Sequence, residues 1–255
     1  MDVEIIIEKG LISVKNDILK QLEIAYNYNL EGIRFIHEGK YEKAIDRFEK
    51  ALMEVPKSYM DPKNNLGVVY FKQGKIAEAQ SIWQGILNLD STYYQAYFNL
   101  GLLEYNQKDY ASARDLWERG LFYNPDYEIG LRDLGILYFM SQDFSRAIVH
   151  FKKAKEVNPK NPLNYVYLAE TYYRIGEIQE AINELKSSFK LDAGNAQGFF
   201  LYASIVHEGG DNREAIKYYK KAISEDSRYA PAFYNLGLAL IAVEDYEAAC
   251  SYLSR

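Results

Sequence analysis

The sequence is poor in the residues that carry most catalytic and metal-binding chemistry. Among 255 residues it has one cysteine, Cys250, and three histidines, His37, His150 and His207. A single cysteine cannot form an intramolecular disulfide, which is typical of a reducing compartment. The histidines lie far apart in the sequence, and none has a second histidine at the spacing of a zinc-binding helix. We therefore expect no catalytic residues, no metal and no cofactor, and we predict that the protein is not an enzyme.

The sequence also lacks an excess of basic residues and a long apolar segment. It has 30 lysines and arginines against 36 aspartates and glutamates, with a formal net charge of -6. No clustered basic face is evident, so we expect no nucleic acid as a partner. The apolar run near the start is too short to cross a bilayer, and acidic residues stand where a signal peptide is basic. We predict no membrane contact from this segment and a cytoplasmic location.

What the sequence does contain is a fixed period. A glycine or alanine stands twelve residues before each alanine of a regular series, and a large apolar residue stands four residues after it. Residues four apart lie on one face of a helix, and residues such as Gly74 and Pro125 between the marks indicate turns. The period predicts a single array of helix-turn-helix units without a linker. The alanines, spaced by 35 residues once and then by 34, are Ala44, Ala79, Ala113, Ala147, Ala181, Ala215 and Ala249.

The strings around these marks resemble the tetratricopeptide repeat. Examples are Leu66-Gly67-Val68-Val69-Tyr70 and Leu134-Gly135-Ile136-Leu137-Tyr138, and the family pattern continues with alanine, an aromatic residue and proline. The resemblance covers residues 25–255 and departs from the pattern where alanine replaces glycine at residues 169 and 203. It implies an all-α fold, a right-handed superhelical solenoid of tetratricopeptide helix-turn-helix repeats. Six full repeats are expected to start near residues 25, 60, 94, 128, 162 and 196, and a truncated seventh near residue 230.

The two ends of the chain differ from the repeats. Residues 1–24 lie outside the repeat phase, but apolar residues from Ile18 to Ile24 follow a candidate helix cap at Asn16 or Asp17. This helix either covers the apolar face of the first repeat, as terminal units of solenoids must, or associates with another chain through the isoleucines at 5–7. The chain reaches Arg255 midway through the predicted second helix of the seventh repeat. We therefore expect it to be a piece of a longer protein.

The resemblance also implies where a ligand binds. In tetratricopeptide arrays the first helices line a concave groove, and positions 2, 5, 6, 9, 12 and 13 of each first helix face it. These positions form a nearly continuous apolar and aromatic stripe in repeats one to four, which favours an apolar or aromatic peptide segment or an amphipathic helix as ligand. If the phase is shifted by one residue, the same stripe is core packing. The predicted groove residues are Ile33, Val68, Phe71, Phe98, Leu102, Tyr105, Arg132, Ile136, Phe139, Glu170, Tyr173 and Arg174.

Four charged residues occupy groove positions of repeats four and five. They are Arg132, Asp133, Glu170 and Arg174. One interpretation is mutual neutralisation, because Glu170 and Arg174 are four residues apart on one helix. The other is that they contact a charged or amide side chain of the ligand and fix its register.

Two ligand-binding modes of the family are not favoured. Repeats one to three lack the cations that hold a C-terminal carboxylate of heat-shock chaperones, and only Asn65 matches that pattern. An asparagine ladder needs asparagine at the sixth position of successive repeats, where only Asn65, Asn99 and Asn235 provide it. Asparagine contacts to a peptide backbone are therefore expected at single repeats and not along the whole array.

These observations predict a noncatalytic protein–protein interaction scaffold or adaptor whose partner is a protein or peptide. The alternative is the substrate- or partner-recognition arm of a larger enzyme, or of a membrane or assembly machine, whose active part lies beyond residue 255. Both readings use the same groove, because a solenoid determines a mode of binding and not a particular partner.

Overall fold

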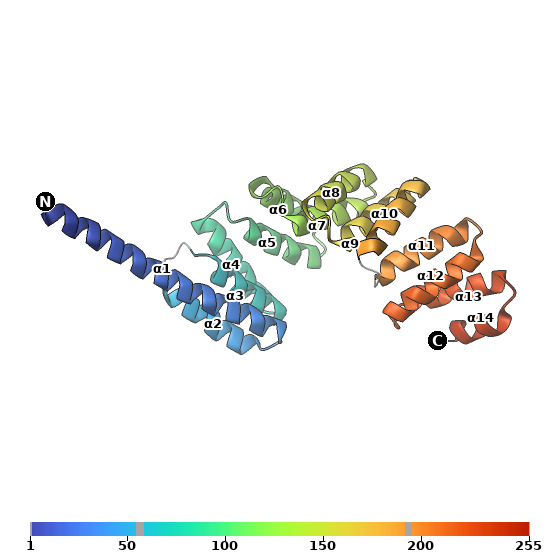
Figure 1. The fold of residues 1–255 in the computed structure, drawn as a ribbon, viewed down its shortest axis with the longest axis horizontal. Coiled ribbons are helices and arrows are strands. Elements are labelled where there is room, and N and C mark those ends of the chain that lie inside the picture. The colour runs from blue at the N-terminus through green and yellow to red at the C-terminus, as the bar shows by residue number, and fades with distance from the viewer. Residues whose placement is uncertain (1, 55–58, 192–194, 255) are drawn as a thin grey trace. The chain divides into compact units, whose positions relative to one another are not determined.

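The computed structural model describes residues 2–54, 59–191 and 195–254, with side chains from Ile18 onward. Within these residues the chain forms fourteen α-helices and no strand (Figure 1). The first helices of the repeats are α1 (Asp2–His37), α3 (Asp61–Lys72), α5 (Tyr94–Asn106), α7 (Glu128–Met140), α9 (Pro162–Arg174), α11 (Ala196–Glu208) and α13 (Ala230–Ala242). The second helices are α2 (Tyr41–Glu54), α4 (Ile76–Leu89), α6 (Tyr110–Tyr123), α8 (Phe144–Val157), α10 (Ile178–Leu191), α12 (Asn212–Glu225) and α14 (Tyr246–Leu253).

The chain divides into two compact units, Met1–Pro125 and Asp126–Arg255. The first unit holds α1 to α6 and the second holds α7 to α14. Within each unit, every first helix packs on its own second helix, and each second helix packs on the first helix of the next repeat. Successive first helices also touch one another, as α3 does α5 and α9 does α11. This neighbour-to-neighbour packing is typical of a repeat array.

Six first helices begin at, or one residue after, the repeat starts expected from the sequence, from α3 at Asp61 to α13 at Ala230. The seventh, α1, differs because it is a single helix of 36 residues that continues through the expected boundary at residue 24. No helix therefore starts at Asn16 or Asp17, and the cap expected there is wrong. Residues 11–31 contain neither glycine nor proline, so nothing in them interrupts the helix. The side chains of residues 1–17, including the isoleucines at 5–7, lie outside the described part.

The core of each repeat is a small residue on the first helix facing a large one on the second. A Cβ at Gly67 would stand 2.5 Å from the Trp83 indole nitrogen, so only glycine leaves room for this ring. The same indole donates a hydrogen bond to the Asn64 carbonyl at 3.3 Å. Where alanine replaces glycine at Ala169, the facing residue is the smaller Leu185, and both are fully buried. At Ala169 the smaller partner thus matches the departure from the repeat pattern, whereas Ala203, the other departure, packs in one cluster with the large Tyr219.

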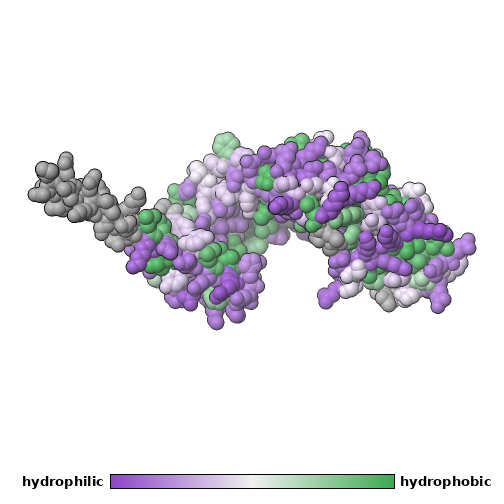
Figure 2. All heavy atoms as spheres, in the orientation of Figure 1, coloured by the Kyte–Doolittle hydropathy of each residue, from purple (hydrophilic) through white to green (hydrophobic). Residues whose placement is uncertain are grey.

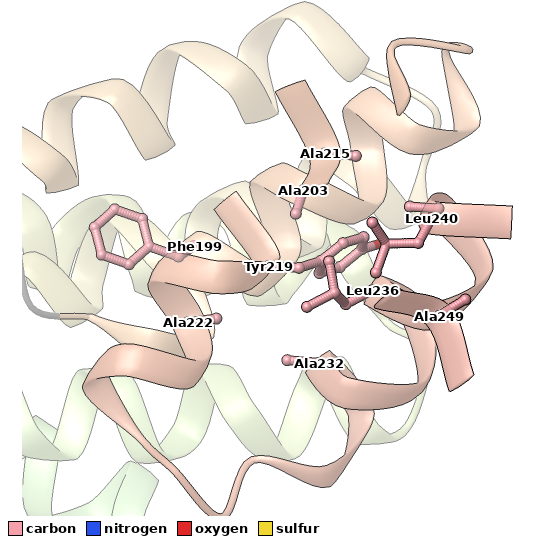
Figure 3. Packing of buried hydrophobic residues seen from close by; sticks show 10 residues of the cluster. Phe199, Ala203, Ala215, Tyr219, Ala222, Ala232, Leu236, Leu240 and Ala249 are labelled. Carbon is pink, nitrogen blue, oxygen red and sulfur yellow. The ribbon is translucent and has the colours of Figure 1, made fainter. Parts of the chain in front are cut away.

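The last repeats show how one core cluster joins neighbouring units. Tyr219 of α12 is almost fully buried beside Leu236 of α13, and Ala203 and Ala215 belong to the same cluster (Figure 3). The Tyr219 hydroxyl donates to the Ser204 hydroxyl at 3.2 Å, so the buried polar atom has a partner. Large side chains on second helices therefore reach between the first helices on either side of them.

The turn within each repeat has one residue with a left-handed backbone. Glycine takes this conformation in four repeats, for example Gly74 with φ of 77°. The equivalent residues Lys108, Gln142 and Glu244 adopt it in the other three, with φ of 67°, 61° and 64°. Glycine populates this region without a steric penalty, whereas other residues do so at a cost. The chain direction reverses in the same way whether or not glycine is present.

No helix in the described part of the chain has both the length and the apolar composition needed to cross a membrane.

Candidate ligand-binding surface on the first helices

The apolar residues at the predicted groove positions lie at the edge of the core. In the first unit, Leu102 on α5 is 39% exposed, whereas its neighbours Gly101 and Leu103 are buried. Ile33 and Val68, the equivalent residues on α1 and α3, are half-buried against the core clusters of their repeats. The ninth position of these helices therefore lies between the core and the surface.

Aromatic side chains widen this surface in the first unit. The Phe71 ring lies 6.1 Å from the Trp83 ring, and the Tyr105 ring stacks on Trp117 at 5.8 Å between ring centroids. Both Phe71 and Tyr105 stay half-buried, so one side of each ring remains accessible. Phe98 differs, since only 7% of it is exposed and its ring fills the space beside Gly120. Phe98 contributes to packing more than to an accessible surface.

Asparagines on neighbouring first helices of this unit are hydrogen-bonded to one another. The Asn65 amide nitrogen donates to the Asn29 side-chain oxygen at 2.9 Å, and that of Asn99 donates to the Asn64 oxygen at 2.7 Å. In both pairs the sixth position of one repeat bonds the fifth position of the repeat before it. The sequence contains this signal as asparagines about 35 residues apart, but it does not reveal that they pair.

In the second unit, Arg132 is held by a partner on its own helix. Its guanidinium donates to the Glu128 carboxylate at 2.8 Å, and the Asn161 amide donates to the same carboxylate oxygen at 2.8 Å. The ion pair that Arg132 forms in the described part of the chain is thus with Glu128, while its charge also acts on Asp133. Burial raises the pKa of the Asp133 carboxyl to about 6; the Arg132 charge opposes the rise and the Glu128 charge adds to it.

Glu170 and Arg174 do not form the expected ion pair among the described residues. The Arg174 guanidinium lies over the rings of Phe139 and Phe144, 5.5 and 5.7 Å from their centroids. Glu170 accepts one hydrogen bond, from the Gln197 side chain at 3.3 Å. Burial raises the pKa of Glu170, although the Gln197 hydrogen bond and the charge of Arg174 act in the opposite direction. Glu170 is thus a half-buried carboxylate with little compensation.

A pocket of about 390 Å³ opens beside Glu170 in the second unit. With the exception of Tyr219, every residue that lines it occupies a groove position predicted from the sequence. The Tyr173 hydroxyl donates to the Glu208 carboxylate at the side of this pocket. The lining residues are Glu170, Tyr173 and Arg174 from α9, Phe200, Leu201, Ser204, His207 and Glu208 from α11, Tyr219 from α12, and Asn235 and Leu238 from α13.

The structure brings part of the predicted site together. Glu170, Tyr173 and Arg174 share the pocket, whereas Ile136 and Phe139 are half-buried on α7 and Phe139 packs edge-on against Phe144 at 5.6 Å. The choice of residues from the sequence missed Tyr219, because it belongs to a second helix and the groove was assigned to first helices. It also stopped at repeat five and so left out the pocket residues of α11 and α13.

Apolar residues at further groove positions of the second unit are exposed as well, namely Ile129, Met140 and Leu238. Figure 2 shows hydrophobic residues reaching the surface in separate patches among hydrophilic ones. The part of the chain that the structure describes contains no group of three or more histidine, cysteine, aspartate or glutamate side chains able to hold a metal ion.

The fold defines a class of proteins: helical repeat arrays that present the surface of their first helices. A family model described as tetratricopeptide repeat matches residues 64–122, 98–162 and 207–255, and another with this description matches residues 35–90. The chain belongs to the tetratricopeptide repeat family, whose members are typically protein–protein interaction scaffolds. A model described as anaphase-promoting complex, cyclosome, subunit 3 matches residues 140–222. No curated protein matches the chain in sequence.

Solved structures show the same fold. The chain resembles pilF of Pseudomonas aeruginosa with a TM-score of 0.71 and 20% identity, over 84% of this chain and 96% of that one. It resembles the Cut9–Hcn1 hetero-tetramer structure of the APC/C with a TM-score of 0.65 and 16% identity, over 84% of this chain and 42% of that one. YrrB, described as a tetratricopeptide repeat protein with an unusual peptide-binding site, gives 0.59 and 20%, over 74% and 96%. At these identities the likeness concerns the fold alone.

Proposed function

We propose that this protein is a noncatalytic scaffold that binds an apolar or aromatic peptide segment, or an amphipathic helix, against its first helices. The observation that carries the proposal is the exposure of Leu102 between two buried residues on α5. An apolar side chain in this place contributes little to the core, but it is available to a ligand. The half-buried Ile33 and Val68 at equivalent positions extend this surface within the first unit, and Ile136 holds the equivalent position in the second unit.

The mode of binding follows from the geometry of helices. Accessible residues at the ninth and twelfth positions of a first helix are three apart and lie on one face, so each repeat offers a pair of contacts. A ligand with apolar residues at helical or alternating spacing can meet several such pairs. Aromatic side chains buried at the centre of such a contact carry most of the affinity.

The proposal predicts that Leu102→Glu combined with Ile136→Glu removes ligand binding without unfolding the protein. A carboxylate at each position would be desolvated by an apolar ligand, so we expect at least a tenfold loss of affinity, about 1.4 kcal/mol. The experiment captures partners from a lysate of the source organism with the native protein and the variant, and identifies them by mass spectrometry. Circular dichroism checks that helical content and the melting transition are kept.

A matched control places the same charges on second helices. Phe122→Glu with Val149→Glu changes residues that are 79% and 64% exposed on α6 and α8. We expect this variant to retain the partners. Loss of the same partners from both variants would contradict binding at the first helices, and unfolding of the first variant would show that Leu102 and Ile136 belong to the core.

A role as the recognition arm of a larger assembly is the second candidate. The match of residues 140–222 to the model of an anaphase-promoting complex subunit favours it. Both candidate functions use the same surface. They differ in whether the protein acts alone or delivers the bound partner to the rest of an assembly.

Three expectations from the sequence stay predictions. They are the cytoplasmic location, the covering or self-associating role of residues 1–24, and the expectation that the chain is a piece of a longer protein.

A further inference from the structure

We propose that the pocket lined by α9, α11 and α13 receives the side chain of a lysine or arginine of the bound segment, with its positive charge beside Glu170. This inference rests on the proposed function and specifies the chemistry of the ligand. The sequence left open whether the charged groove residues contact a charged or an amide side chain of the ligand, and the pocket assigns a basic one.

The first argument is the state of Glu170. A carboxylate has about four acceptor sites, and Glu170 receives one long hydrogen bond from a neutral amide, that of Gln197 at 3.3 Å. The nearby cation, Arg174, lies over the Phe139 and Phe144 rings instead of bonding to it. A half-buried carboxylate in this position gains more from a new cation than an exposed one does, because fewer water molecules compete.

The second argument is the balance of charge around the pocket. Glu170 and Glu208 both line it, and Glu208 is bonded only to the neutral hydroxyl of Tyr173 among the described residues. Arg174 is the one permanent cation of the lining, and His207 is the remaining titratable nitrogen group. With histidine neutral, two negative charges face one positive charge that is already engaged with aromatic rings. An anionic ligand group would be repelled by these two carboxylates, whereas a cationic group would be attracted to them.

The third argument is the size of the pocket and the aromatic and apolar side chains that line it. Phe200 and Tyr173 are half-buried aromatic residues on the lining, and Leu201 and Leu238 add apolar surface. The methylene stem of lysine or arginine packs on such walls, while its charged end is attracted to aromatic faces and to carboxylates. A volume of about 390 Å³ is at the small end of ligand pockets. It suits one long side chain of a segment whose other residues lie outside.

The experiment selects ligands from a random 12-residue peptide library displayed on phage, using the native protein, Glu170→Gln and Glu180→Gln. Glu180 is an exposed residue of α10 and gives a control with the same change of charge. We expect the native protein and the control to enrich peptides with apolar anchors and a lysine or arginine at a fixed distance from them. Glu170→Gln is expected to keep the apolar anchors and lose the preference for the basic residue.

Synthetic peptides then measure the pair interaction. For one selected peptide, replacing its basic residue by glutamine is expected to weaken binding to the native protein about tenfold and to Glu170→Gln less than twofold, as in a double-mutant cycle. The inference is overturned if the native protein enriches acidic residues or no charged residue, or if Glu170→Gln weakens both peptides equally. In those cases the proposed function stands, because peptides are still selected.

Failure of the proposed function gives a different result. The native protein then selects no peptides, or selects peptides that bind equally well to the variant with Leu102→Glu and Ile136→Glu. Either result contradicts the inference as well, because no bound segment would be available to supply the basic residue.

Discussion

Asp133 is a residue whose buried charge lowers the stability of the folded protein. It occupies the sixth position of its repeat, where it is half-buried beside the Arg132–Glu128 ion pair and accepts no hydrogen bond from the described residues. Burial disfavours the charged carboxylate, and the pKa rises to about 6. A residue that opposes folding at neutral pH is a candidate for function, since such groups gather at binding sites.

We predict that Asp133→Asn stabilises the protein at neutral pH and not in mild acid. The folded state has the higher pKa, so the native protein loses stability as the pH rises from about 4, the unfolded value, through about 6. Asparagine removes this loss. Because Asp133 is only half-buried, we expect a gain of about 1 to 2 kcal/mol at pH 7.5, less than the full shift implies. Urea unfolding at pH 7.5 and pH 4 measures it.

The control for this prediction is Asp115→Asn on α6, which removes the same charge from an exposed site. We expect the difference in unfolding free energy between this variant and the native protein to change little with pH. A gain at pH 7.5 that persists at pH 4 would show that repulsion by the buried carboxylate is not the cause in Asp133→Asn.

At the scale of single residues, the sequence identifies the core better than the binding surface. The small residues of the period and its large residues up to Tyr219 are buried, because the same contact forms in these repeats, whereas Leu253 at the end of the series is 44% exposed. Phe98 was assigned to the groove, and its burial depends on the space left by Gly120, on another helix and outside the marks of the period. Arg132 was assigned to a charged cluster on groove positions, and Glu128, one turn away on the same helix, forms an ion pair with it.

At the scale of elements, the unit of stability is the contact between a first and a second helix. Trp117 of α6 lies against Gly101 of α5, and its indole donates to the Phe98 carbonyl at 3.1 Å. The ring therefore contributes both packing and a satisfied buried donor. Any side chain at Gly101 must displace it.

We predict that Gly101→Ala destabilises the protein even though alanine favours helices. Its Cβ would overlap the Trp117 ring, and moving the ring would strain the packing and lengthen the hydrogen bond to Phe98. Overpacking of this kind costs about 1 to 3 kcal/mol. Thermal unfolding followed by circular dichroism, together with tryptophan fluorescence, measures the loss and the changed environment of the ring.

Gly85→Ala gives the comparison on α4. A Cβ at Gly85 meets nothing closer than the Lys63 amine at 3.9 Å, so only the helix propensity changes. We expect a gain of about 0.5 to 1 kcal/mol. If both variants gain or both lose stability, the contact with Trp117 is not what requires glycine at position 101.

The starts of six first helices could be predicted because turns and packing marks recur together. The start of α1 could not be predicted, because the repeat pattern marks only the second part of this helix. A helix can continue toward the N-terminus wherever no helix-breaking residue ends it. The turns within the repeats, in contrast, could be located from the period. Lys108, Gln142 and Glu244 adopt the left-handed conformation without glycine, so the period located these turns where composition alone would not.

At the scale of the whole molecule, contacts within each unit join neighbouring helices, and stability is a sum of local terms. We predict that Leu236→Ala, a fully buried change on α13, costs about 2 to 5 kcal/mol and speeds amide hydrogen exchange in α11 to α14. Exchange in α2 to α4 is expected to stay as in the native protein. Hydrogen exchange with mass spectrometry resolves these helices.

Leu238→Ala is the control, because this residue lies two positions away and is exposed. It is expected to leave exchange nearly unchanged. Equal acceleration in every helix of Leu236→Ala would mean that the chain unfolds as one cooperative body, which would contradict the local description.

The pairing of small and large residues across each helix pair also constrains how such a chain can be lengthened or rebuilt. Gly67 with Trp83 and Gly101 with Trp117 are one solution to the problem of volume, and Ala169 with Leu185 is another. Duplication of a stretch of DNA that encodes a whole repeat copies both members together and preserves the fit. Recombination between them joins a small residue from one solution to a large residue from another, so viable crossovers should fall at the repeat borders and be rare between the paired helices.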